Sequence, residues 1–219
     1  MATRQLLSEL TGAYTERTGQ AVSIESVGGV DAARRVQAGE AFDVVILASD
    51  AIAKLVASGH LRADSKVDLV HSGVAVAVRA GATPPDIASE DAVRQAVLAA
   101  STLSYSTGPS GVALAQLFER WGIADQIRDR LVTAPPGVPV GSLVAKGEVG
   151  LGFQQLSELI HVQGITIVGP LPAASQITTT FSAAMTTGCT RAPDVHALLD
   201  FMASNDAAPA KRRQGMEPA

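Results

Sequence analysis

The sequence predicts an α/β fold in two lobes, each built on a mostly parallel sheet with flanking helices. Apolar segments of strand length alternate with segments of helical periodicity almost throughout. Residues 42–48 form an apolar run typical of a strand buried in a parallel sheet. Two Pro/Gly-rich breaks, at 81–86 and 169–173, isolate a middle segment. We therefore expect lobe I to comprise residues 1–80 plus 174–219, lobe II residues 82–172, and hinge crossings near residues 81 and 173.

The first third of the chain predicts alternating helices and strands. A helix starts at once, and Gly19 ends it; its apolar face carries Leu6, Leu7, Leu10 and Tyr14. Residues 22–27 alternate between apolar and polar, which predicts a half-buried strand. The expected elements that follow are a helix over 32–38, the strand over 42–48, a helix ending near Gly59, and a strand over 73–79.

The remainder continues the alternation. Ser89 is expected to cap a helix, and a strand ending at Tyr105 leads into another helix. Further strands are expected over 131–133, 149–153, 165–168 and 178–186. Further helices are expected over 124–130, 140–146, 193–204 and 209–214.

The stretch from Leu103 to Leu114 is the most informative in the chain. An apolar run ends at Tyr105, six small or turn-forming residues follow, and apolar residues then recur at helical spacing through Val112, Ala115, Phe118 and Trp121, with Leu114 off the stripe. A helix that starts this way directs unpaired N–H groups and the positive end of its dipole into the loop. Small hydroxylated residues add O–H donors, so the pattern favours anion capture, with an ordinary capped helix as the alternative.

Composition excludes several classes of function. With 47% hydrophobic and 17% charged residues, the 219-residue chain is expected to form a packed core. The net charge is −4, and the densest basic cluster, Lys211–Arg213, is too short to follow a phosphate backbone, so we expect no nucleic-acid binding. The single cysteine, Cys189, and four scattered histidines lack metal-ligand spacing, and no metal or cofactor is expected. No run of 18 apolar residues predicts membrane insertion.

Several segments resemble a known family in their order and spacing. They are Gly39–Glu40 with residues 42–48, residues 69–79 with Gly81, the loop Ser106–Gly111, Lys146–Gly152, and Gly215–Pro218. Together they are similar to the periplasmic substrate-binding proteins of the molybdate-binding type, the extracellular solute-binding class of ABC transporters. The resemblance covers nearly the whole chain.

The resemblance implies a type II periplasmic-binding-protein-like fold that closes on a small anion by hinge motion. It implies a membrane ABC transporter permease as partner and a periplasmic location, with a cytoplasmic location as the alternative if the resemblance does not hold. The family's chain normally begins with a strand and a Ser-rich loop ahead of its first helix. Residues 1–4 would already be that loop, so we expect the first strand and any export signal to be missing from this sequence.

The candidate ligand contacts fall into two groups, with no residue assigned as catalytic. The strongest are Ser106, Thr107, Ser110 and Gly111 of the loop, joined by Val138 and Pro139, which the resemblance puts beside the ligand, and by Gln155 at a strand end. Nearer the N-terminus, the candidates are Thr3 and Arg4 as hydroxyl and guanidinium donors, and Gly28, Gly29 and Val30 as a backbone loop.

Two functions remain open. The first is a receptor that captures a small oxyanion or carboxylate for transport. Gly28–Val30 replace the family's Ser-Ser loop and Gln155 replaces a Tyr, which favours a small carboxylate held by Arg4 over molybdate. The second is an isomerase of small tricarboxylates such as aconitate on the same scaffold. It needs a general base, and none stands out, since Glu158 is expected to act as a helix cap. A regulator's effector domain is disfavoured because no DNA-binding segment accompanies it.

Overall fold

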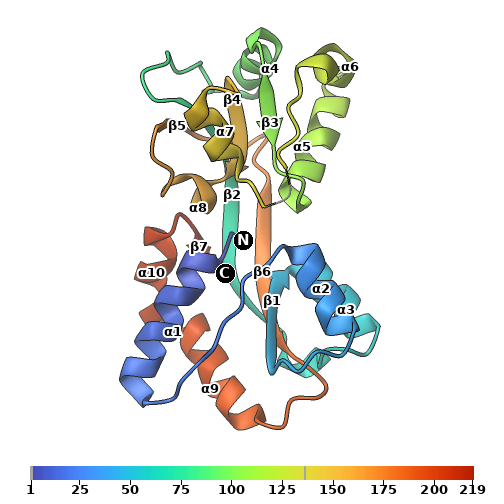
Figure 1. The fold of residues 1–219 in the computed structure, drawn as a ribbon, viewed down its shortest axis with the longest axis vertical. Coiled ribbons are helices and arrows are strands. Elements are labelled where there is room, and N and C mark those ends of the chain that lie inside the picture. The colour runs from blue at the N-terminus through green and yellow to red at the C-terminus, as the bar shows by residue number, and fades with distance from the viewer. Residues whose placement is uncertain (1, 136) are drawn as a thin grey trace. The chain divides into compact units, whose positions relative to one another are not determined.

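The computed structural model describes residues 2–135 and 137–219, and its backbone contacts divide them into two compact units. Unit 1 contains the chain up to Ser72 together with Thr179–Ala219, and unit 2 contains Gly73–Thr178. Strands β2 (Val67–Arg79) and β6 (Thr178–Met185) carry the chain from one unit into the other (Figure 1).

Unit 1 combines helices with a small antiparallel sheet. Its strands β1 (Val44–Ala48), β6 and β2 lie in that order, and β1 pairs with β6 in antiparallel register from Val44 opposite Met185 to Ala48 opposite Phe181. Its remaining elements are α1 (Arg4–Thr18), α2 (Gly29–Gln37), α3 (Ser49–Ala57), α9 (Ala192–Ala203), α10 (Ala208–Arg213), β7 (Glu217–Pro218) and short 3₁₀ turns at Ala63–Ser65 and Asn205–Ala207.

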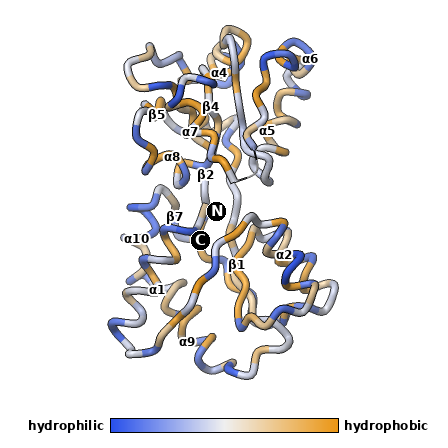
Figure 2. Tube along the Cα trace, in the orientation of Figure 1, coloured by the Kyte–Doolittle hydropathy of each residue, from blue (hydrophilic) through white to orange (hydrophobic). Residues whose placement is uncertain are grey.

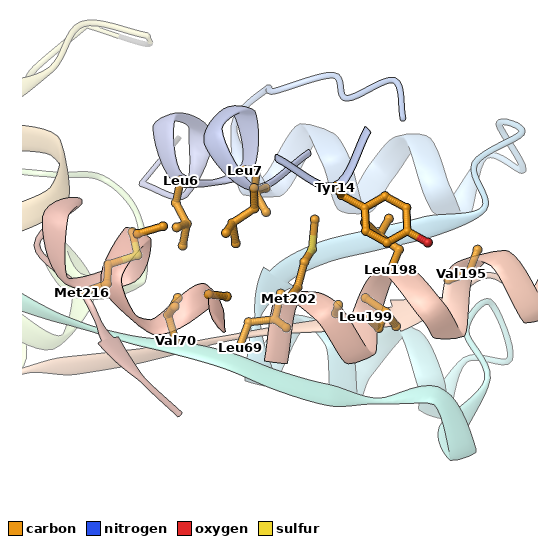
Figure 3. Packing of buried hydrophobic residues seen from close by; sticks show 14 of the residues in the cluster. Leu6, Leu7, Tyr14, Leu69, Val70, Val195, Leu198, Leu199, Met202 and Met216 are labelled. Carbon is orange, nitrogen blue, oxygen red and sulfur yellow. The ribbon is translucent and has the colours of Figure 1, made fainter. Parts of the chain in front are cut away.

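The main core of unit 1 lies between α1, α9 and the sheet. The expected apolar face of α1 is confirmed: Leu6, Leu7, Leu10 and Tyr14 are all buried. Figure 3 shows Leu6, Leu7 and Tyr14 of α1 directed toward the buried residues of α9, with Leu69 and Val70 of β2 below. Gly19 ends α1 in the left-handed conformation, at φ 73°, as the sequence predicts.

Unit 2 is built around the part of β2 that follows Ser72. Strand β2 pairs with β4 (Leu151–Gln155) on one side and with β5 (Ile165–Pro170) on the other, and β3 (Leu103–Tyr105) lies beyond β4. The helices of this unit are α4 (Glu90–Ala99), α5 (Pro109–Arg120), α6 (Ala124–Ile127), α7 (Val140–Lys146), α8 (Leu156–Leu159) and a 3₁₀ turn at Arg128–Arg130.

The expectation of mostly parallel sheets is wrong. Strands β3 and β4 run parallel, whereas β1–β6, β2–β4, β2–β5 and β2–β7 are antiparallel, so the sheet is mixed and mostly antiparallel. An apolar run indicates that a strand is covered on both faces, and helices can provide that cover whatever the direction of the neighbouring strand. Figure 2 shows β1 as such an apolar stretch, although its partner β6 is antiparallel.

Helix α5 packs into the core of unit 2, but through a different face from the one expected from the sequence. Val112 is 56% exposed, whereas Leu114, placed off the stripe by sequence, is buried with Leu117 and Phe118. The Phe118 ring meets Phe153 of β4 edge-on, at 5.9 Å between centroids. Phe118 belongs to both stripes, and the buried side of the helix continues from it through Leu114 and Leu117 because that side faces β4.

Replacing Phe118 with alanine should destabilise unit 2 by about 3–5 kcal/mol, because it removes a fully buried ring and leaves a cavity among aromatic neighbours. Urea unfolding followed by tryptophan fluorescence would measure this, since Trp121 lies against the same ring. Val112→Ala, on the exposed side of the same helix, is the matched control and should change the free energy of unfolding by less than about 0.5 kcal/mol.

Candidate functional site

The parallel pairing of β3 and β4 brings two chain turns to one edge of unit 2. Leu103 lies opposite Leu151 and Tyr105 opposite Phe153. Ser106 therefore leaves the sheet beside Gln154, at the carboxyl ends of both strands. This is the edge at which open α/β sheets present their ligand sites.

The loop Ser106–Gly111, here named the anion loop, leads directly into α5. Ser106 and Ser110 join their hydroxyls at 3.1 Å between oxygens. Gly108 is the N-cap of α5 and Pro109 its first residue, as expected for a strand–loop–helix unit. Thr107 is exposed and Ser110 is buried, so the loop offers one outer and one inner hydroxyl.

Gly111 is required by the fold of the anion loop. A Cβ atom at this position would lie 1.5 Å from the carbonyl oxygen of Ser106, which no side chain allows. The Gly111 and Val112 amides both donate to the Gly108 carbonyl, at 3.0 and 3.1 Å. The absence of a side chain lets the loop fold back onto the first turn of α5 and keeps Ser106 next to Ser110.

Gln154 connects three elements at the end of β4. Its side-chain oxygen accepts a hydrogen bond from the Gly141 amide in the first turn of α7, at 3.1 Å, and its side-chain nitrogen donates to the Glu158 carboxylate on α8. Helix α7 lies close against β4 at Gly152, where a Cβ would come within 2.5 Å of Val144. A buried amide that both donates and accepts thus fixes α7 and α8 relative to the strand.

Glu158 is the residue that sequence reasoning missed. It does not cap α8, whose N-cap is Gln155; its carboxylate accepts from Gln154 instead. Burial raises the pKa of the Glu158 carboxyl above its usual value of 4.5, while the hydrogen bond from Gln154 acts in the opposite direction. Gln and Glu four residues apart within a strand-to-helix turn are the sequence signal that could have indicated this contact.

Gln155 lies beside this group with an amide that is only 6% exposed. Its backbone pairs with Val74 of β2 and caps α8. Its role as a ligand contact remains a prediction.

The other unit 2 candidates lie in the turn before α7. Pro139 is the N-cap of α7, and the Val138 amide donates to the Pro135 carbonyl at 3.0 Å. Pro139 is exposed and Val138 is half-buried. Pro136 of the same turn lies outside the described residues.

The unit 1 candidates stand at two helix starts. Thr3 is the buried N-cap of α1 without a side-chain capping bond, and Arg4 is exposed as the first helical residue. Gly28 is the N-cap of α2, Gly29 is its first residue, and Val30 is 84% exposed. As ligand contacts, these five residues remain predictions.

Two further properties limit the chemistry of the described residues. They contain no group of three or more His, Cys, Asp or Glu side chains arranged to hold a metal ion. None of their helices combines the length and the apolar character needed to cross a lipid bilayer.

Gly111→Ala should distort the anion loop, because its new methyl group would collide with the Ser106 carbonyl. We expect a loss of about 1–3 kcal/mol in the free energy of unfolding. Gly108→Ala is the matched control: a Cβ there meets only the Ser106 hydroxyl at 3.7 Å, and φ is −83°. Equal destabilisation by the two variants in thermal unfolding would contradict the loop geometry described above.

The raised pKa of Glu158 has a definite effect on stability. Between its unfolded value and its higher folded value, the folded state holds more protons, so this group costs stability as pH rises through that window. Glu158→Gln should therefore gain stability relative to wild type as the pH rises above about 4.5, the ordinary value of a Glu carboxyl. Urea unfolding across this range measures the difference, and Glu148→Gln, at an exposed position, should not reproduce the trend.

Comparison with known proteins identifies the family of the chain. The family model for bacterial extracellular solute-binding proteins matches residues 1–217. An aconitate isomerase from a Pseudomonas species is 41% identical over 97% of this chain and 83% of its own length.

Solved structures agree on the fold. The substrate-binding domain of a putative molybdenum ABC transporter from Clostridium difficile superposes with a TM-score of 0.80 at 14% identity, over 100% of this chain and 95% of that one. The periplasmic molybdate-binding protein of Azotobacter vinelandii gives a TM-score of 0.79 at 22% identity, over 98% and 95%. The chain belongs to the bacterial extracellular solute-binding protein family, and its fold is like that of these two molybdenum-related proteins.

Proposed function

We propose that this protein isomerises a small tricarboxylate of the aconitate type. The observation that carries the proposal is the 41% identity to aconitate isomerase over nearly the whole chain, far above the identities to the molybdate-related structures. The groups at the β3–β4 edge of unit 2 suit such a substrate, because they combine anion donors with the half-buried Glu158 carboxyl.

The reaction needs only a proton transfer. In aconitate the central carbon carries a carboxylate and joins a methylene carbon to a vinylic carbon. A base removes a proton from the methylene, the resulting charge spreads over the allylic carbons and the adjacent carboxylate, and a proton returns to the former vinylic carbon. The double bond has then moved and can close in the other geometry. The overall reaction has no oxidation step and requires no co-reactant.

The anion loop supplies the substrate contacts in this proposal. The hydroxyls of Ser106, Thr107 and Ser110 and the start of α5 bind one carboxylate. Their donors also stabilise the negative charge that develops when the proton leaves. In this proposal three hydroxyl groups and the helix dipole hold the anion, so its binding does not require a metal ion.

Glu158 is the proton-transfer group in this proposal. A carboxyl whose pKa is raised by burial is matched to taking and returning a proton near neutral pH better than an exposed one. Gln154 holds the Glu158 carboxylate and positions α7 at the same time. Glu158 takes a proton from one carbon, its carboxyl proton exchanges with solvent, and Glu158 then delivers a proton to the other carbon.

A receptor function is the second candidate. The family match and the two molybdenum-related structures favour a protein that binds a small anion in the periplasm and presents it to an ABC transporter permease. In that case the anion loop and Gln155 would hold the solute, and Glu158 would have no chemical role.

Catalytic turnover of aconitate distinguishes the two functions. Purified protein incubated with cis-aconitate, and separately with trans-aconitate, should approach the same mixture from both sides, as followed by proton NMR. In deuterium oxide the methylene should acquire deuterium, because the transferred proton exchanges with solvent. Stabilisation by molybdate or a tricarboxylate in thermal unfolding, without any turnover, would instead establish the receptor.

Glu158→Gln tests the assigned proton-transfer group. It should lower kcat by about 10²- to 10⁴-fold while the tricarboxylate still raises the unfolding temperature, because the amide keeps the shape of the side chain but cannot take a proton. Glu148→Gln, at an exposed site, should leave kcat unchanged. Wild-type kcat in the Glu158→Gln variant would remove this residue from the mechanism.

A further inference from the structure

Lys211 of α10 is a cation in the interior of unit 1. Only 1% of its surface is exposed, although a lysine normally lays its stem along apolar surface and keeps its ammonium in water. Burial lowers the pKa of the Lys211 ammonium, and no charge or hydrogen bond from the described residues opposes that effect. The described part of the chain therefore gives this buried cation no partner.

Two acidic residues beside α10 are engaged by its other polar side chains. Arg213 donates to the Glu9 carboxylate on α1, and Gln214 donates to the same carboxylate at 2.9 Å. Arg212 donates to the Glu217 carboxylate of β7 at 3.4 Å. Both carboxylates thus have partners, and neither neutralises Lys211.

Ser72 of β2 is a second buried donor of unit 1 without a partner. The residue is fully buried, and its hydroxyl makes no hydrogen bond within residues 2–135 and 137–219. Folded proteins rarely bury a hydroxyl unpaired, because the lost hydrogen bonds to water are not replaced. The hydroxyl therefore calls for a partner just as the Lys211 ammonium does.

The pairing of β2 with β7 brings these two residues to the same end of unit 1. The strands are antiparallel, with His71 opposite Glu217. Continuing this register by one residue sets Ser72 opposite Met216. The Met216 amide in turn donates to the Lys211 carbonyl at 3.0 Å. Ser72 thus lies beside the turn through which α10 leads into β7.

Ser72 also faces the layer of helices to which α10 belongs. Side chains two positions apart along a strand project to the same face, so Ser72 shares the face of Val70. Val70 packs into the core that contains Ala210 of α10 and Met216. The unpaired hydroxyl and the helix that carries the unpaired ammonium therefore lie in adjoining layers of unit 1.

We propose that Lys211 and Ser72 form an anion subsite in unit 1, which binds one carboxylate group of a small organic acid. Both groups are donors, so the partner that they lack is an anion. Lys211 supplies the charge and Ser72 donates through its hydroxyl. One ammonium balances one carboxylate, whereas a dianion such as molybdate would keep an uncompensated negative charge in the interior.

This inference does not depend on the proposed function, because an isomerase and a receptor would both bind an organic anion. The anion loop of unit 2 offers hydroxyls and a helix start but no full positive charge. Arg4, the cation expected from the sequence, is exposed, and water weakens its attraction for a carboxylate. Lys211 is shielded from water, so its charge attracts a carboxylate more strongly.

Lys211→Met tests the subsite, because methionine keeps an unbranched side chain but removes the charge. In calorimetric titration, the variant should bind citrate roughly 30-fold or more weakly than wild type. Without citrate it should unfold about 3 °C or more above wild type, since it buries no unpaired charge. Lys54→Met, the same change at an exposed position on α3, is the matched control and should alter neither quantity.

Two further measurements test the second donor and the class of anion. Ser72→Ala should weaken citrate binding about 3- to 10-fold without lowering the unfolding midpoint, because the hydroxyl has no partner in the free protein. Sodium phosphate and sodium molybdate, at an ionic strength matched with sodium chloride, serve as comparison probes. Lys211→Met should change their affinities by less than about threefold. A loss as large as that for citrate would overturn the assignment to carboxylates.

Three other outcomes would overturn the subsite itself: citrate binding of equal strength in wild type and Lys211→Met, a wild type that binds no citrate, or an unliganded Lys211→Met variant that unfolds below wild type. The last would show that the ammonium already has a favourable partner in the free protein. Failure of the proposed function is a separate result. A wild type without aconitate turnover, whose citrate affinity still depends on Lys211, keeps the subsite and removes the isomerase.

Discussion

The parallel pairing of β3 with β4 is the constraint on which the candidate site depends. Parallel strands end at the same edge of a sheet, so the residues that follow them are neighbours although they are far apart in sequence. Here that register sets Ser106 beside Gln154. An antiparallel pairing would have put the anion loop and the Gln154 turn at opposite edges, and no shared site could form.

Gln154 shows how a site can be held by one uncharged side chain. Its amide accepts from α7 and donates to α8, so two short helices that could not be stable alone are fixed to the strand. The same contact keeps the Glu158 carboxyl at the sheet edge while burial raises its pKa. Structural support and chemical tuning therefore come from the same hydrogen-bond network.

The comparisons separate fold from function. The molybdate-related structures match almost the whole chain at 14% and 22% identity, which supports a shared architecture and says little about the ligand. The relative at 41% identity is an enzyme, and the proposed site combines a half-buried carboxyl with candidate anion donors. A solute-binding scaffold needs only the donors; the carboxyl is the feature that proton transfer would use.

Features that depend on residues close together in the sequence were predicted reliably. The apolar face of α1, the glycine that ends it, and the strand–loop–helix unit at Ser106–Gly111 follow from helical periodicity, glycine conformation and turn-forming residues. The α/β class and the family follow from the same patterns read along the whole chain. These features depend on residues within a few positions of one another.

The rest required the tertiary structure. The predicted strand direction was wrong because an apolar run indicates only that helices cover both faces of a strand. It does not indicate whether the neighbouring strand is parallel. Glu158 was missed because its burial depends on how α7 and α8 pack against β4. The predicted strand at Val22–Val27 failed because a strand needs a neighbour to bond with. Local patterns were enough to predict which segments can be helix or strand and where a candidate anion loop lies. Which of these segments meet could not be read from them, because pairing and burial depend on residues distant along the chain.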